Sequence, residues 1–246
     1  MWQGIYQELK DRNFVIVSVA FDTGGRSAVK DFIRPPGPIE LPLNFQEIMG
    51  WSGEQYARAA APAYPNLIDE KHIVAELYNM TNVPMGVWID ENRQIVRPAE
   101  AAGASDGFRA MDRTTFQLTK DAVQQTISNR TRYVNAVCDW VMKGAASEYS
   151  LSAEEVRRRI EGPHPVDALA MANFRMGQYL YQAGHRDDSR RYFNEARRLC
   201  PERWHYFRQA LDLEETGKAS GPEFFQAVDS LGERPYYPPV NFKPSR

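Results

Sequence analysis

The sequence predicts an α/β domain followed by an all-α domain. The stretch Phe14–Phe21 is nearly all β-branched or aromatic, which is typical of a strand buried on both faces in a parallel sheet. The stretch Asn82–Val96 reads as a loop, a proline, a strand, a polar turn and a second strand. After Gly103, apolar residues recur at spacings of three and four, which indicates helices. A chain of 246 residues is long enough for two modest domains.

Composition and charge exclude several classes of protein. The net charge is −2 with acidic and basic residues interspersed, so nothing predicts binding to nucleic acid or to an anionic membrane surface. No apolar run approaches the roughly 18 residues that a membrane span needs. An amphipathic segment follows Met1 directly, without the regions of a signal peptide, so we expect the chain as written to be cytoplasmic. A longer form could be exported.

The residues that usually carry redox or metal chemistry are sparse. The two cysteines, Cys138 and Cys200, are far apart and form no Cys-x-x-Cys motif. The four histidines are scattered along the chain. We therefore expect no catalytic residue, no cofactor and no metal site in this chain.

The first elements predict a crossover unit. Trp2, Ile5, Tyr6 and Leu9 form one apolar helical face, and the strand Phe14–Phe21 follows. Asp22 either caps the turn at the end of this strand or acts as a polar group near a redox site. A second helix is expected from Arg26 to Ile33, where a run of prolines stops it: Pro35, Pro36 and Pro38.

The middle of the α/β domain contains one long excursion. Residues Ile39–Ala63 are predicted to be either a packed surface excursion or a lid that recognises substrate. Asp69 is a suitable N-cap for a helix that carries Ile73 and Leu77. This helix leads into the loop before Pro84.

The proline loop opens a hairpin. Proline cannot donate to a sheet ladder, so Pro84 fits best at the start of its strand. Residues 90–93 supply the turn before the second strand. We expect the strand Met85–Asp90 to run antiparallel to Phe14–Phe21. The side chains expected to be buried are Val15, Val17, Val19, Val87 and Ile89.

Three phrases of this sequence, in this order and spacing, resemble one known family: Tyr6–Asp22, Tyr64–Glu70 and Tyr78–Asp90. That family is the ResA/TlpA-like branch of the thioredoxin superfamily, which comprises thiol–disulfide oxidoreductases and their AhpC/TSA-type redoxin relatives. The resemblance covers Gly4–Gly103 and implies a thioredoxin-like fold with a cis Val83–Pro84 bond. It also implies that Val83 and Pro84 bind the substrate, a protein or small-molecule thiol or disulfide, through the backbone of Val83.

The resemblance implies a redox motif that this chain lacks. In the family, a central strand precedes the first helix, and that helix opens with Cys-x-x-Cys or a selenocysteine variant. A helix N-terminus stabilises the thiolate and lowers its pKa. This chain begins inside that helix and is thus N-terminally incomplete by comparison. One interpretation is a start codon placed after a selenocysteine codon read as a stop; the other is a degenerate family member.

These interpretations lead to two predicted functions. The favoured one is a thioredoxin-like redox protein whose cysteine or selenocysteine centre lies upstream of Met1. The alternative is a redox-inactive thioredoxin-like and helical-repeat module for protein interaction. In either case Cys138 and Cys200 are expected to be packed structural thiols that do not replace the absent pair.

The helical half contains one candidate repeat. Residues Phe116–Met142 and a capping box that starts at Ser152 predict helices, and Gly162–Pro165 predicts a hinge. Ala170–Arg203 resembles one tetratricopeptide repeat of about 34 residues, with Gly184 as its turn and small residues where its helices meet. The repeat implies a protein partner, and residues 166–169 and 204–213 are expected to stack against it.

The end of the chain is rich in proline and tyrosine. Residues 234–239 are unsuited to helix or sheet, so the tyrosines either strap the segment across the helical domain or bind a partner. The predicted divisions are a thioredoxin-like domain lacking its first strand and redox motif, a helical connector, a tetratricopeptide-like helical domain and a tail: residues 1–104, 105–162, 163–233 and 234–246.

Overall fold

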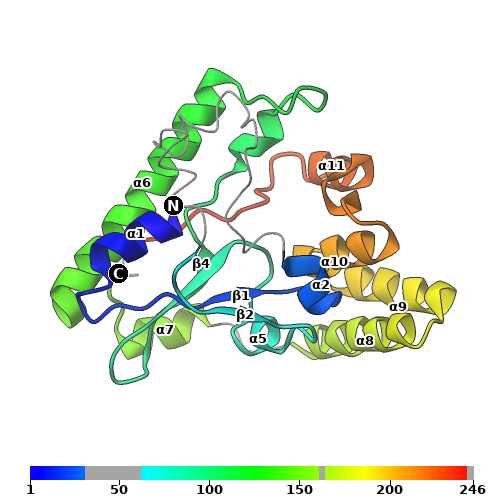
Figure 1. Cartoon of the computed structure of the whole chain (residues 1–246), viewed down its shortest axis with the longest axis horizontal. Helices are drawn as coiled ribbons and strands as arrows, with labels where there is room; N and C mark the ends of the chain where they lie inside the picture. Colours follow the sequence, from blue (N-terminus) through cyan, green and yellow to red (C-terminus); the bar gives the residue numbers. More distant parts are fainter. Residues whose placement is uncertain (31–61, 161–163, 243–246) are drawn as a thin grey trace.

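The computed structural model describes residues 1–30, 62–160 and 164–242. They form a mixed α/β N-terminal part with small sheets, followed by a mostly helical region (Figure 1). The predicted order, an α/β part followed by a helical part, is confirmed. Most of the excursion 39–63, the end of the predicted helix 26–33 and the first part of the hinge lie outside the described residues.

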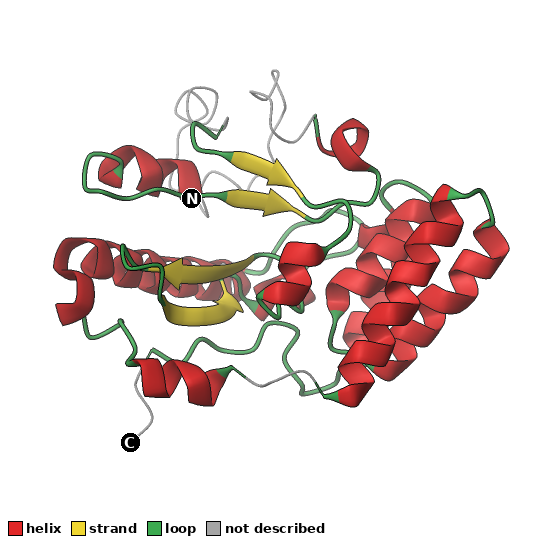
Figure 2. Cartoon of the chain, turned by 90° about the horizontal axis from the view of Figure 1, so that it is seen from below, coloured by secondary structure: helices red, strands yellow, loops and turns green. Residues whose placement is uncertain are grey.

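Two separate strand pairs form the sheets of the N-terminal part (Figure 2). Strands β1 and β2 pair in parallel, with Ser18 opposite Asn66. Strands β3 and β4 pair antiparallel, with Ile89 opposite Ile95, as the hairpin pattern predicts. The elements of this part are α1 (Trp2–Leu9), β1 (Ser18–Ala20), α2 (Gly25–Val29), β2 (Asn66–Ile68), α5 (Ile73–Leu77), β3 (Met85–Ile89) and β4 (Ile95–Ala101).

The predicted fully buried strand 14–21 is wrong in length and in burial. Only Ser18–Ala20 is strand, and Val15 and Val17 are 61% and 51% exposed. Ile89, also expected inside, is 42% exposed, whereas Val19 and Val87 are half-buried. Among the described strands β1 has β2 as its one neighbour, so it is an edge and not a central strand. Val15 and Val17 lie in the irregular segment before β1, where no described strand pairs with the chain.

Helix α6 (Lys120–Lys143) builds the first core against the hairpin. Trp88 of β3 stacks on Trp140 at 5.1 Å between ring centroids, and its indole N–H donates to the Tyr133 hydroxyl at 2.9 Å. Ile5 and Leu9 of α1 belong to the same buried cluster, as the apolar face of the first helix predicts. The first core therefore joins α1, the hairpin and α6.

A fully buried arginine lies at the edge of this core. Arg97 on β4 is 0% exposed, and its guanidinium donates two hydrogen bonds of 2.7 Å to the Glu100 carboxylate. It also donates to the carbonyls of Tyr149 at 2.9 Å and Asn241 at 3.0 Å. The guanidinium carbon lies 5.1 Å from the centre of the Phe242 ring. Arg97 thereby connects β4 with two distant segments of the chain.

Of the remaining helices, η1 precedes α6 and the others follow it (Figure 1). Ser152 caps its helix as predicted, since its Oγ accepts from the Glu155 amide at 3.2 Å. The Glu155 carboxylate, which in a capping box would accept the Ser152 N–H, pairs with Arg158 and Arg159. The described elements are η1 (Asp106–Ala110), η2 (Gly144–Ala146), α7 (Ala153–Arg159), α8 (Pro165–Gln182), α9 (Arg186–Leu199), α10 (Trp204–Glu214), η3 (Lys218–Ser220) and α11 (Pro222–Asp229).

Helices α8 and α9 form the predicted antiparallel pair. Gly184 makes the turn with φ of 87°, and Phe193 lies directly over Gly177. Helix α10 packs on this pair through Tyr206, as expected for the segment after the repeat. The expected stacking of residues 166–169 is wrong for two of them: Val166 and Leu169 are 42% and 52% exposed, because they lie on the outward face of α8 itself.

The C-terminal segment links the two halves without regular secondary structure, as its prolines predict. Tyr236 is buried against Trp204 and Phe224 in the helical region. Phe242 is buried in the first core with Tyr133. The predicted strap across the helical domain is confirmed, and the segment extends further, to the α/β half (Figure 1).

No helix among the described residues is both long and apolar enough to cross a membrane.

The contact between α8 and α9 leads to a stability prediction. A Cβ at position 177 would lie 2.7 Å from two ring carbons of Phe193. Gly→Ala in a free helix stabilises by about 1 kcal/mol, but overpacking costs about 1–3 kcal/mol. We expect Gly177→Ala to lower the free energy of unfolding in urea by about 1 kcal/mol. In a Phe193→Leu background the same change should be neutral or stabilising; a gain in the native background would contradict the close approach.

A second prediction concerns Arg97. Lysine cannot reproduce its forked contacts, so Arg97→Lys should lower the free energy of unfolding by roughly 3 kcal/mol. The matched control is Arg198→Lys on α9, whose Glu195 partner is exposed. That change should alter stability by less than about 0.5 kcal/mol. Equal effects of the two substitutions in urea titrations would show that the buried contacts of Arg97 contribute little.

Candidate functional site

The predicted substrate-binding residues lie in the loop between α5 and β3. The Val83–Pro84 bond is cis, as the resemblance implies, and Pro84 is exposed just before β3 begins. The Met85 sulfur accepts the amide N–H groups of Thr81 at 3.2 Å and Asn82 at 3.4 Å. The Asn82 Oδ1 accepts the Val83 N–H at 2.9 Å. Hydrogen bonds from within the loop therefore hold its shape.

The carbonyl of Val83 faces the C-terminal segment. It accepts a hydrogen bond of 2.7 Å from the Tyr237 hydroxyl. The buried Asn82 side chain contacts Tyr236 twice: its Nδ2 donates to the Tyr236 carbonyl at 3.3 Å, and its Oδ1 accepts the Tyr236 hydroxyl at 3.1 Å. Both backbone groups of Val83 thus have partners within the chain.

Two residues of η1 complete this arrangement. The Asp106 carboxylate accepts the backbone N–H groups of Tyr236 at 2.8 Å and Tyr237 at 2.7 Å. Arg109 donates to the carbonyls of Gly232 at 2.7 Å and Arg234 at 3.0 Å. We call Asn82, Asp106 and Arg109 the cradle, since they hold the main chain of residues 232–237.

The sequence did not identify the cradle as a site. The tyrosine pair of the tail is the one signal that pointed to it, and that signal did not reveal the partner of the strap. Asp106 lies 130 residues before Tyr236, so no motif spacing connects them. At the other end of the α/β part, Asp22 caps its turn by accepting the Gly24 N–H at 2.8 Å, as one of its two interpretations predicts.

The two thiols lie elsewhere and are poor nucleophiles. Cys200 is 1% exposed, and its Sγ donates to Asp167 Oδ1 at 3.3 Å. Burial, and then this hydrogen bond, raise the pKa of the Cys200 thiol to about 12. Cys138 on α6 is half-buried, and burial raises its pKa too. Both thiols are expected to stay protonated near neutral pH. The packing predicted for Cys200 is confirmed, and that of Cys138 is only partial.

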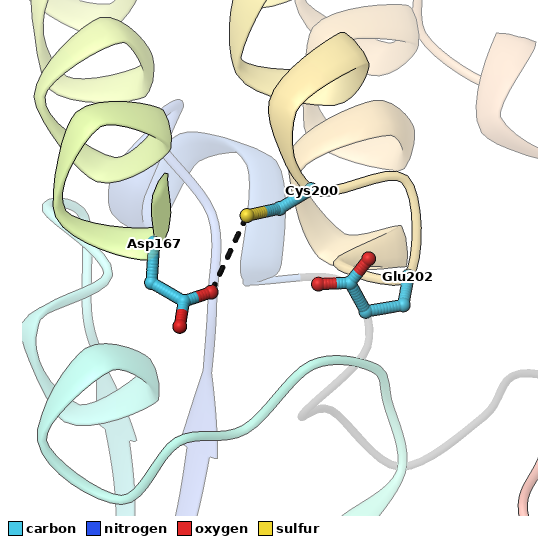
Figure 3. Close-up of side chains that lie close together, drawn as sticks. All are labelled: Asp167, Cys200 and Glu202. Atoms are coloured by element: carbon cyan, nitrogen blue, oxygen red, sulfur yellow. Dashed lines mark hydrogen bonds between the residues drawn. The ribbon is translucent and has the colours of Figure 1, made fainter. Parts of the chain in front are cut away.

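Cys200 belongs to a group of three possible metal ligands (Figure 3). Its ligand atom lies within 4.8 Å of those of Asp167 and Glu202. A metal requires the thiolate form. The Cys200 thiol is instead expected to stay protonated, and its S–H donates a hydrogen bond to Asp167. The guanidinium of Arg203 lies 3.5 Å from the same Asp167 oxygen and already supplies positive charge there. The group fits a hydrogen-bonded thiol better than a bound cation.

The fold also brings together two histidines that are distant in the sequence. His72 precedes α5, His205 lies on α10, and their rings stack at 5.6 Å between centroids. Nε2 of His72 hydrogen-bonds Gln209 Oε1 at 3.1 Å, and the same oxygen accepts the Thr23 N–H at 3.0 Å. The ring nitrogens of His205 have no hydrogen-bond partner among the described residues. This buried polar cluster connects the α/β half to α10.

Burial determines the charge state of both rings. It lowers the pKa of His72 to about 4. Burial, and then the neighbouring His72, lower the pKa of His205 to about 3. Two further groups contact the cluster: the Gln178 Nε2 donates to the Thr23 hydroxyl at 2.6 Å, and Phe174 lies edge-on to His72. Both histidines are therefore expected to be neutral at physiological pH.

Comparisons of the chain with protein-family models, with curated proteins and with solved structures find no match. The resemblance to thioredoxin-like proteins stays a prediction, as does the resemblance to a tetratricopeptide repeat.

The histidine pair leads to a prediction of pH dependence. Each pKa is lower in the folded state than the ordinary value of 6.5, so the unfolded chain binds more protons in acid. The contribution to stability is complete above pH 6.5 and is lost as the pH falls toward 4 for His72 and toward 3 for His205. The expected loss is on the order of 1.4 kcal/mol per pH unit for each histidine.

The measurement is urea unfolding at several pH values between 7.5 and 5, with His205→Phe as the matched variant. Phenylalanine retains an aromatic ring next to Phe21 and Phe174 but cannot take up a proton. The variant should lose less stability than the native chain over this range. Parallel curves would show that His205 does not contribute to the acid sensitivity.

Proposed function

We propose that this chain belongs to a thioredoxin-like redox protein of the thiol–disulfide oxidoreductase or redoxin class, in which it holds the substrate. In this proposal a cysteine or selenocysteine pair, carried by a segment upstream of Met1, performs the redox chemistry. The backbone of Val83 beside Pro84 binds the extended thiol or disulfide substrate. The helical half contacts the protein partner.

The observation that carries the proposal is the edge of β1 that pairs with no other described strand. Ser18 donates its N–H to the Pro65 carbonyl, and the Ala20 carbonyl accepts the Asp69 N–H, so both residues turn their polar backbone groups toward β2. Successive residues of a strand alternate in the direction of these groups. Those of Val19 therefore face away from β2, and among the described strands β1 has no second neighbour.

An additional strand beside Val19 would satisfy these groups, because an unpaired edge is a template for pairing. The division into β1–β2 and β3–β4 agrees with a thioredoxin-like sheet whose central strand comes from elsewhere. In the resembling family, that strand leads directly into the helix with the redox pair. The arrangement thus supports a scaffold that works together with such a strand.

The alternative proposal is a redox-inactive module for protein interaction. Two observations support it. Cys200 is buried and the pKa of its thiol is raised, and the Val83 carbonyl already accepts a hydrogen bond from the Tyr237 hydroxyl. The two proposals differ in what an upstream cysteine or selenocysteine pair would add.

The test is reduction of insulin disulfides. The 246-residue chain should show no turnover, and neither should its Cys138→Ser and Cys200→Ser variants. A form extended upstream, with an in-frame UGA codon read as selenocysteine, should turn over and should lose activity when its own pair is changed to serine. An upstream region without such a pair, or an extended form without turnover, would contradict the redox proposal and favour the alternative. Turnover by the 246-residue chain that disappears in either serine variant would place a redox centre in the helical half.

A further inference from the structure

We propose that residues 232–239 form an intramolecular strap that occupies the binding place of an extended peptide beside Val83. Substrate then gains access only when the strap is displaced. The role of Val83 rests on the proposed function, whereas the contacts of the strap with the cradle do not depend on it.

The cradle contacts main-chain atoms of the strap. Asp106 accepts two backbone N–H groups, Asn82 donates to one carbonyl and Arg109 donates to two. Contacts to main-chain atoms are available to any extended segment that presents the same groups, as in peptide recognition by strand addition. The cradle therefore fits an extended peptide as a class and not this tail alone.

The prolines of the strap are placed where they remove no contact. The N–H groups that Asp106 binds belong to the two tyrosines, and prolines flank them at positions 235, 238 and 239. Proline has no N–H and keeps the chain extended, so it lowers the entropy cost of binding without removing a contact. The tail has the composition of a preformed extended ligand.

The two tyrosines show which side chains the site selects. Tyr236 is 2% exposed, with its ring 4.6 Å from Trp204 and 5.1 Å from Phe108 between centroids. Tyr237 is half-buried and uses its hydroxyl on the Val83 carbonyl. The matching partner is an extended peptide with a buried aromatic residue followed by a hydrogen-bond donor.

The Tyr237 contact is separable from the anchors of the tail. Phe242 is buried in the first core and Tyr236 in the helical region. Between them Pro238 and Pro239 are exposed. An open groove of about 570 Å³ borders the cradle, and Asp106 and Arg109 line it. A competing segment can thus reach Asp106 and Arg109 from this groove and displace both tyrosines, while Phe242 remains in the first core.

The experiment uses the full chain and a fluorescein-labelled peptide with the sequence of residues 233–239, Glu-Arg-Pro-Tyr-Tyr-Pro-Pro. Tyr237→Phe removes the hydroxyl from the strap and leaves the ring and the backbone. The labelled peptide should bind this variant about five-fold more tightly than the native chain by fluorescence anisotropy, the factor that one hydrogen bond of about 1 kcal/mol contributes. A peptide with phenylalanine for the second tyrosine should bind Tyr237→Phe about five-fold more weakly than the tyrosine peptide does.

The matched control is Asp106→Asn, which keeps the shape of the side chain but leaves one acceptor oxygen in place of two. Because the strap and the peptide use the same Asp106 contacts, combining it with Tyr237→Phe should weaken both alike and leave the affinity of the labelled peptide for Tyr237→Phe nearly unchanged. Hydrogen exchange of the Tyr236 and Tyr237 amides should accelerate when the native chain is titrated with the peptide. Equal affinity of the native chain and Tyr237→Phe, or unchanged amide exchange, would overturn the strap.

Insulin reduction by the upstream-extended form separates this inference from the proposed function. Tyr237→Phe should raise its kcat/KM about five-fold, by the same single hydrogen bond. Turnover with no effect of Tyr237→Phe on kcat/KM or on peptide affinity would overturn the strap and leave the redox proposal standing. Peptide competition without turnover would support the strap and overturn the redox proposal.

Discussion

The structure depends on how one fully buried charge is satisfied. Arg97 has no exposed surface, and a buried guanidinium is tolerated only when its donors have partners. Glu100 neutralises it from the same strand, while carbonyls of Tyr149 and Asn241 take up further donors. The segment before α7 and the end of the tail are thereby held against the hairpin. Between α11 and the first core, the tail contacts the loop before Pro84.

A second set of polar contacts joins the two halves. Gln209 on α10 hydrogen-bonds both the turn at Thr23 and the ring of His72. Arg175 on α8 pairs with Glu76 of α5, and Arg203 donates to Asn79 at 2.7 Å. The α/β part and the helical region are therefore connected through hydrogen bonds, of which those of Gln209 are buried, and through ring contacts such as that of His72 with Phe174. Buried networks of this kind specify one arrangement because each unpaired member is costly.

Three segments of the chain meet beside Val83. The loop before β3 contributes Asn82 and Val83, η1 contributes Asp106, and the tail contributes its tyrosines. A redox protein with a guarded substrate site and an interaction module that binds its own tail would both use this geometry. They differ in the source of a reactive thiol or selenol, since Cys200 is buried and protonated.

The sequence alone determined the local features. The periodicity of α1, the turn chemistry of the hairpin and the cap at Ser152 follow from residues a few positions apart, whose interactions are local. The close approach of two helices at Gly177 and the irregular structure of the proline-rich tail could also be predicted. The absence of a side chain and the fixed φ of proline act at their own positions. The tertiary structure decided the exposure of Val15, the meeting of His72 with His205 and the seating of Tyr237 on Val83. These features depend on which distant segments become neighbours, and the periodicity of a single segment carries no information about its partner.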